Sequence, residues 1–220
     1  MTAFPTAGLY AIVDVDALAT RSIEPLDFAI AVLEGGARVL QLRAKHTPDD
    51  DVITLLRRLG EPTRAAGALL FANDRPDLAA ASGCDGVHVG QSDVPVVEVR
   101  VRFPHLLVGL STHTEEETTR AAEIAPDYIA FGPIFPTKTK QDASPVVGLE
   151  RLARVRGATR LPLVGIGGID ASTCTHVAAR GALVAVVSAL VDGEPSAAAI
   201  AARTRDLVDR ITGPRAGQSS

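Results

Sequence analysis

Eight short, predominantly apolar runs recur along the chain, and segments with helical periodicity lie between most of them. The runs lie at residues 9–13, 39–43, 69–72, 86–89, 107–111, 128–131, 163–166 and 183–187. Because most of the runs are continuously apolar instead of alternating with polar residues, they predict strands of a parallel sheet that is buried on both faces. This repeated pattern restricts the chain to the α/β folds.

The amphipathic segments between these runs predict helices. They include residues 26–34, 49–66, 115–125, 149–155 and 172–180. Two of them begin with N-cap signals, since Thr47 and Pro48 precede the second and Thr114 is followed three residues later by Glu117. Pro95 and Pro104 interrupt the stretch between residues 89 and 107, where a helix is only weakly marked.

Eight strand–helix units in 220 residues fit one compact (β/α)₈ TIM barrel near the lower end of its size range. An open, doubly wound sheet is the alternative. The count of eight strands favours the barrel. The positions of the polar motifs favour it too, because they follow most of the strands and are not gathered at a single crevice. We therefore predict a single barrel domain over residues 1–212, followed by a disordered Gly- and Ser-rich tail at residues 213–220.

Composition excludes several classes of protein. The net charge of −4 argues against a broad affinity for nucleic acids or anionic membranes. Cys84 and Cys174 are too few for a disulfide framework and lack metal-type spacing. The longest strongly apolar stretch, residues 182–191, is too short to cross a bilayer, and residues 1–5 lack a secretory signal pattern. We expect a soluble, cytoplasmic protein with neither nucleic-acid nor membrane partners.

The second apolar run ends in polar residues that face one side. Strand alternation places Gln41, Arg43 and Lys45 together. The planar fork of an Arg side chain and the point charge of a Lys side chain suit the binding of a diphosphate. The alternative is that these residues are simply exposed at the end of a strand.

Two carboxylates follow neighbouring strands. Asp74 comes after the third run and Asp93 after the fourth, and Asn73 lies beside them as a potential phosphate ligand. Each Asp could instead cap the next helix. Two carboxylates next to a basic strand end favour a Mg²⁺ site, because this ion takes oxygen ligands and keeps several waters.

A basic loop follows the sixth run. Residues 132–140 contain Thr137, Lys138, Thr139 and Lys140, which suit phosphate oxygens at the carboxyl end of a strand. A solvated surface loop is the alternative for this segment taken alone.

The seventh and eighth runs end in a second candidate anion site. Gly167 and Gly168 would let backbone N–H groups approach a phosphate, and Ser188 adds a hydroxyl nearby. After the fifth run, Ser111 is a hydroxyl donor and His113 could orient a substrate or transfer a proton. Two anion sites imply two phosphorylated substrates or one substrate phosphorylated at both ends. His88, inside an apolar run, is interpreted as a hydrogen-bonded core histidine.

These motifs, in this order, resemble the thiamine phosphate synthase family over essentially the whole chain. The matching segments are residues 9–14, 41–45, 73–75, 86–93, 109–114, 127–140, 166–169 and 186–189. The resemblance implies a (β/α)₈ barrel that joins a pyrimidine diphosphate, HMP-PP, to a thiazole phosphate and releases pyrophosphate with Mg²⁺. Ala44 departs from a frequent Glu and carries no ligand group.

The resemblance also implies residue roles. The pyrimidine diphosphate would be held by Gln41, Arg43, Lys45, Asn73, Ser111 and Lys140, of which Arg43, Lys45, Ser111 and Lys140 would be catalytic. Asp74 and Asp93 would bind Mg²⁺. The thiazole phosphate would be held by Thr137, Lys138, Thr139, Gly167, Gly168, Val187 and Ser188.

Two rival functions remain to be weighed against a synthase. A thiazole tautomerase would need the monophosphate site and a histidine such as His113, without a diphosphate clamp. A non-catalytic sensor of phosphorylated ligands should have lost clamp or metal residues, and none is lost. The sequence does not decide between a monomer and a homo-oligomer, and residues 142–147 are a candidate lid.

Overall fold

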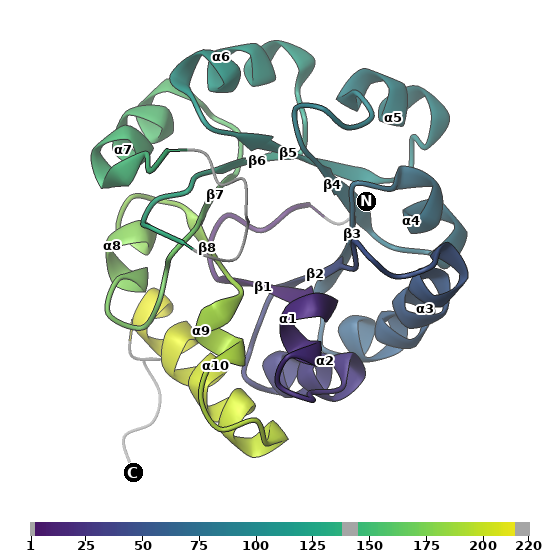
Figure 1. Cartoon of the computed structure of the whole chain (residues 1–220). Coiled ribbons are helices and arrows are strands. Elements are labelled where there is room, and N and C mark those ends of the chain that lie inside the picture. The colour runs from purple at the N-terminus through teal and green to yellow at the C-terminus, as the bar shows by residue number, and fades with distance from the viewer. Residues whose placement is uncertain (1–2, 138–144, 214–220) are drawn as a thin grey trace.

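Eight parallel strands close into a barrel in the order β1 to β8, so the prediction of a (β/α)₈ barrel is confirmed (Figure 1). The computed structural model describes residues 3–137 and 145–213. The strands are β1 (Leu9–Asp14), β2 (Val39–Arg43), β3 (Leu69–Asn73), β4 (Gly86–Val89), β5 (Leu107–Thr112), β6 (Tyr128–Phe131), β7 (Leu163–Ile166) and β8 (Leu183–Val186). The open doubly wound sheet is excluded because β1 pairs with both β2 and β8.

Most of the helices form a ring outside the barrel (Figure 1). They are α1 (Val15–Ala19), α2 (Pro25–Glu34), α3 (Asp49–Ala65), α4 (Pro76–Ser82), α5 (Val96–Arg102), α6 (Glu115–Ile124), α7 (Gly148–Ala158), α8 (Cys174–Ala178), α9 (Ser188–Val191) and α10 (Ala197–Thr212). The Thr114 hydroxyl accepts from the Glu117 backbone N–H, so the predicted N-cap of α6 is confirmed. In the described part of the chain, no helix is long and apolar enough to cross a membrane.

Helix α8 is shorter than the predicted helix over residues 172–180. The Asp170 carboxylate accepts hydrogen bonds from the backbone N–H groups of Ser172 and Thr173. These bonds form a turn that competes with the first helical turn, so the helix begins only at Cys174.

The core has two layers. Strand residues that face outward pack against the helices, and those that face inward fill the barrel. Glycines provide space inside the barrel. A Cβ at Gly109 would lie 2.1 Å from the ring of Tyr128, and one at Gly86 would lie 2.3 Å from the ring of Phe71.

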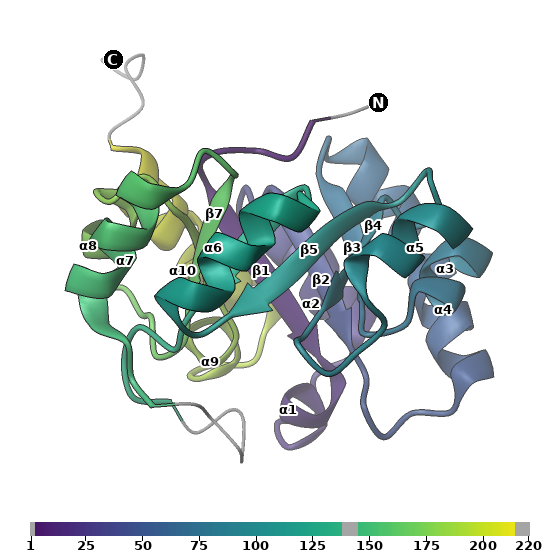
Figure 2. The same cartoon turned by 90° about the horizontal axis from the view of Figure 1, so that it is seen from above.

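The N-terminal segment closes one end of the barrel. Phe4 stacks on Tyr128 with ring centroids 4.0 Å apart and meets Phe71 edge-on at 5.8 Å. Figure 2 shows this segment at the upper end of the barrel, whereas α1, which directly follows β1, lies at the lower end. The carboxyl ends of the strands are therefore the open end.

Candidate active site

One cavity of about 150 Å³ lies at the carboxyl ends of the strands. Among its lining residues are Gln41, Arg43, Asn73, His88, Ser111, His113, Thr137, Gly167, Gly168, Val187 and Ser188. It opens beside a wider groove of about 1380 Å³ that Arg43, Lys45, Thr137, Gly168 and Ser188 also line. The structure thus brings most of the residues predicted from separate loops to one place.

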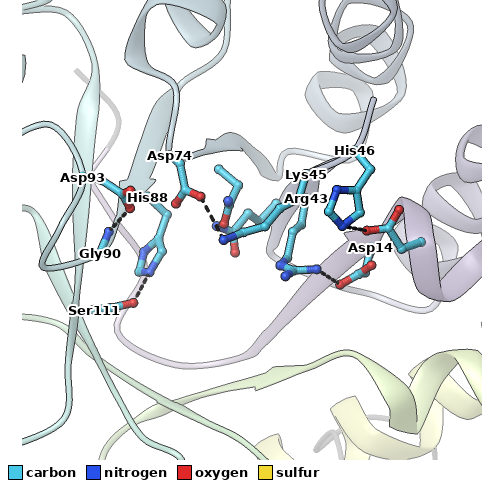
Figure 3. A network of polar contacts seen from close by, with 12 residues as sticks. Asp14, Arg43, Lys45, His46, Asp74, His88, Gly90, Asp93 and Ser111 are labelled. Atoms are coloured by element: carbon cyan, nitrogen blue, oxygen red, sulfur yellow. Dashed lines mark hydrogen bonds and ion pairs between the residues drawn. The ribbon is translucent and has the colours of Figure 1, made fainter. Parts of the chain in front are cut away.

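Strand β2 supplies the polar wall of this cavity. Gln41 is buried and donates from Nε2 to Asn73 Oδ1 on the adjacent strand at 3.1 Å. Arg43 Nη1 donates to Asp14 Oδ2 at 2.7 Å (Figure 3). Asp14 was not among the predicted site residues, although its place at the end of the first apolar run was a signal that could have identified it.

Asp74, Asp93 and Lys45 form a charged cluster beside the cavity. Lys45 Nζ lies 3.6 Å from Asp74 Oδ2, and Asp93 Oδ2 accepts from the Gly90 backbone N–H at 2.7 Å (Figure 3). Burial raises the pKa of Asp74, and a hydrogen bond to Asp93 together with its negative charge raises that pKa further, whereas Lys45 lowers it. Two neighbouring carboxylates repel each other unless a proton or a cation lies between them.

Neither carboxylate caps the helix that follows it. The N-cap of α4 is Arg75 and that of α5 is Pro95, and neither helix has a side-chain cap bond. Asp74 has a left-handed backbone with φ of 63°, which is costly for a residue other than Gly. Arg75, next to it, is fixed by a bidentate pair with Asp49 and by Asp77.

The described residues contain no group of three or more His, Cys, Asp or Glu side chains arranged to hold a metal. Mg²⁺ commonly takes only one or two protein carboxylates and completes its shell with waters and substrate phosphates. The Asp74 and Asp93 pair therefore fits this ion and no all-protein metal cage.

The second cluster forms where two loops touch. The Ile134 N–H donates to Ile166 O at 2.8 Å, and the Phe135 N–H donates to Gly167 O at 3.0 Å. Gly168 has φ of 64°, and a Cβ there would lie 2.4 Å from Pro136 O. Only glycine permits this approach, which brings Thr137 to the same cavity as Gly167 and Gly168.

Two histidines line the cavity. His113 Nδ1 lies 2.6 Å from Gly132 O and must therefore carry a proton, because a carbonyl only accepts. His88 bonds to Tyr128 and Ser111. It is a hydrogen-bonded histidine as expected, but it also faces the site, which its apolar neighbours concealed.

Part of the predicted site lies outside the described residues. This applies to Lys138, Thr139 and Lys140, to most of the candidate lid, and to the tail after Gly213. The roles assigned to these residues stay predictions.

Comparison with known proteins decides the family. Residues 9–190 match the family described as thiamine monophosphate synthase. The chain belongs to the thiamine monophosphate synthase family. The matched segment runs from β1 to α9 and contains all the described residues of the candidate site.

Individual members of the thiamine monophosphate synthase family agree with this assignment. A thiamine-phosphate synthase from Methanoculleus marisnigri is 45% identical over 193 residues, covering 86% of this chain and 89% of that protein. One from Roseiflexus sp. is 42% identical over 200 residues, covering 89% and 84%. A solved structure of thiamine phosphate pyrophosphorylase from Pyrococcus furiosus is 32% identical, with a TM-score of 0.84 and coverage of 94% and 96%.

Proposed function

We propose that this chain is a thiamine phosphate synthase, which joins HMP-PP to a thiazole phosphate and releases pyrophosphate. One observation carries the proposal beyond family membership. A single cavity is lined both by the cationic wall at Arg43 and by the glycine and hydroxyl cluster at Gly167, Gly168 and Ser188. Two phosphorylated substrates could therefore bind with their reacting atoms in one space.

The pyrimidine diphosphate would bind along β2 and β3. Arg43 and Lys45 supply positive charge, while Gln41 and Asn73 supply amide groups at the cavity wall. Lys140 would add a further cation from the loop after β6. Ser111 would contact the pyrimidine ring.

Asp74 and Asp93 would hold Mg²⁺ with waters and diphosphate oxygens. When bound, this ion would neutralise negative charge on the diphosphate. The raised pKa of Asp74 beside Asp93 supports this assignment, because a cation would relieve the repulsion between the two carboxylates.

The thiazole phosphate would bind at the second cluster, made of Thr137, Gly167, Gly168, Val187 and Ser188. Lys138 and Thr139 would complete it. Backbone N–H groups and hydroxyls bind phosphate oxygens without a large net charge.

Chemistry at this site needs no nucleophilic side chain. The bond between the pyrimidine methylene carbon and the diphosphate oxygen breaks, and its electron pair leaves with the pyrophosphate. Arg43 and Lys45 stabilise that negative charge, and the aminopyrimidine ring delocalises the positive charge left on the methylene carbon. The thiazole nitrogen then supplies the electron pair of the new C–N bond.

A thiazole tautomerase is less well supported. A tautomerase would need only the second cluster and a proton-transferring group such as His113. It would not require the carboxylate pair or the cationic wall. A sensor without catalysis would not need them either. We place the reaction in the cytoplasm, where the buried Cys84 and Cys174 would remain free thiols as they are here.

The deciding experiment incubates the purified protein with HMP-PP, thiazole phosphate and Mg²⁺. Thiamine phosphate and pyrophosphate should form in equal amounts, and omission of Mg²⁺ should abolish both. Binding of both substrates without any product would contradict the synthase assignment.

A further inference from the structure

A chain of four hydrogen-bonded side chains runs through the barrel interior and ends at the candidate active site. Tyr10 and Tyr128 share a hydrogen bond of 2.9 Å between their hydroxyl oxygens. The Tyr128 hydroxyl lies 2.9 Å from His88 Nδ1, and His88 Nε2 lies 2.8 Å from Ser111 Oγ. His88 and Ser111, whose contact Figure 3 shows, both line the cavity.

The fold provides specific space for these four hydrogen-bonded side chains. The four residues come from β1, β6, β4 and β5, so no two of them belong to the same strand. Gly109 leaves room for the Tyr128 ring, where any Cβ would collide. His88 stacks on the same ring with centroids 5.5 Å apart, and Phe4 covers Tyr128 at the closed end of the barrel.

The protons in this hydrogen-bond chain can be counted. Burial raises the pKa of both Tyr10 and Tyr128, so each hydroxyl is neutral and carries one proton. Within the described residues, the hydroxyl of Tyr10 has Tyr128 as its only hydrogen-bond partner. Two phenolic protons must therefore be placed in the two contacts that join Tyr10, Tyr128 and His88.

Only one direction satisfies both protons. If His88 Nδ1 accepts, Tyr10 donates to Tyr128 and Tyr128 donates to His88, so each phenolic proton has an acceptor. If Nδ1 carries a proton, that proton takes the contact with Tyr128, and one phenolic proton is left buried without a partner. Such a group costs free energy comparable to a lost hydrogen bond, so the first arrangement is favoured.

The favoured arrangement determines what Ser111 can do. A neutral imidazole that accepts at Nδ1 carries its proton at Nε2, so His88 donates to Ser111 Oγ. The Ser111 proton then cannot point at His88 and is left for the cavity. A hydroxyl that could otherwise donate or accept becomes a donor to whatever binds there.

We propose that Tyr128 and His88 are positioning residues that orient the Ser111 hydroxyl as a hydrogen-bond donor to the bound pyrimidine. The site would then select a heteroaromatic ring that presents an acceptor nitrogen at Ser111. The identity of the ligand rests on the proposed function, whereas the direction of the hydrogen-bond chain does not.

The direction can be measured without any substrate. Nitrogen-15 NMR of the ligand-free protein, labelled at histidine and held at a pH of about 8, distinguishes the two neutral tautomers. The spectrum of His88→Gln identifies the His88 signals among those of the five histidines. We expect the proton of His88 on Nε2 alone. A proton on Nδ1 overturns the proposal, whether or not the protein proves to be a synthase.

Kinetics then test whether the chain acts through Ser111. Tyr128→Phe removes the donor to His88 and frees its tautomer, so kcat/KM for HMP-PP should fall roughly tenfold, the equivalent of one hydrogen bond. Tyr10→Phe also removes a buried hydroxyl but leaves Tyr128 donating to His88, so it should change kcat/KM less than about twofold.

A double-mutant cycle separates positioning from packing. If Tyr128 acts through Ser111, Ser111→Ala combined with Tyr128→Phe should be no slower than Ser111→Ala alone. Additive losses, or equal losses in the two Tyr→Phe variants, would show a general packing role and overturn the proposal.

Discussion

Asp14 and Arg43 form an ion pair between directly paired positions of β1 and β2, with Arg43 Nη1 2.7 Å from Asp14 Oδ2. Asp14 is only 2% exposed, and its other carboxylate oxygen accepts from the Ala17 N–H at the start of α1. One buried carboxylate therefore fixes both a helix start and the guanidinium that we assign to the diphosphate.

Asp14→Ala should affect both stability and substrate binding. The variant leaves a mostly buried guanidinium unpaired, which destabilises proteins by about 3 kcal/mol, and it removes the cap of α1. Urea denaturation should show the stability loss, and the KM for HMP-PP should rise because Arg43 is no longer held. Asp16→Ala is the control, because the partly exposed Asp16 makes only a 3.9 Å contact with His46. Equal effects of the two substitutions would disprove this role for Asp14.

Asp93→Ala should abolish most of the activity while preserving the fold. We expect turnover to fall on the order of 100-fold or more, because charge stabilisation at the leaving group is lost. Binding of Mn²⁺, followed by electron paramagnetic resonance as a stand-in for Mg²⁺, should weaken in parallel. Asp50→Ala, at an exposed position in the first turn of α3, should change neither. Unaltered Mn²⁺ binding in Asp93→Ala would remove Asp93 from the metal site.

Lys140→Ala tests a residue outside the described part of the chain. If Lys140 stabilises the departing pyrophosphate, kcat should fall on the order of 100-fold with little change in the free energy of unfolding. Stopped-flow measurement of a single turnover would show whether the chemical step is slowed. A wild-type rate would show that Lys140 does not have the role that the family resemblance implies.

Gly168→Ala should weaken thiazole phosphate binding specifically. The new Cβ would meet Pro136 O at 2.4 Å and separate the two loops that form the second cluster. Gly67→Ala is a matched control, because Gly67 has nearly the same φ of 65° but nothing within 4 Å of its Cβ position. Both variants should lose about 1 kcal/mol for the left-handed backbone, yet only Gly168→Ala should raise the KM for thiazole phosphate. An equal KM in both would show that loop contact does not build this subsite.

Stability should depend on pH through Asp77. A hydrogen bond from Arg75 lowers the pKa of Asp77 below its usual value of about 4. A lowered pKa contributes stability above the unfolded value, and this contribution is lost as the pH falls through the folded value. Asp77→Asn should therefore be slightly less stable than the parent at pH 7, with the gap closing toward pH 2. The effect should be small and sensitive to salt, because Asp77 is 48% exposed. Thermal unfolding at several pH values measures it, and a gap that widens in acid would contradict it.

Local pattern alone predicted the strands and the polar residues that follow them. Apolar runs marked all eight strands to within one residue at each end. Among the helices that were not predicted, α1 and α9 have only five and four residues, which are too few to establish helical periodicity. Alternation along β2 correctly placed Gln41 and Arg43 on the cavity side.

Contacts between distant segments could not be predicted from local sequence patterns. Tyr10 and Tyr128 are 118 residues apart, and nothing near either of them marks the other as a partner. Closure of the barrel places β1 across from β6 and lets His88 connect them to Ser111. The side chains that end each strand can be read from the amino-acid sequence, since strand periodicity is a property of neighbouring residues. Which of these side chains meet is fixed by the closed barrel, because it depends on how eight strands share one interior.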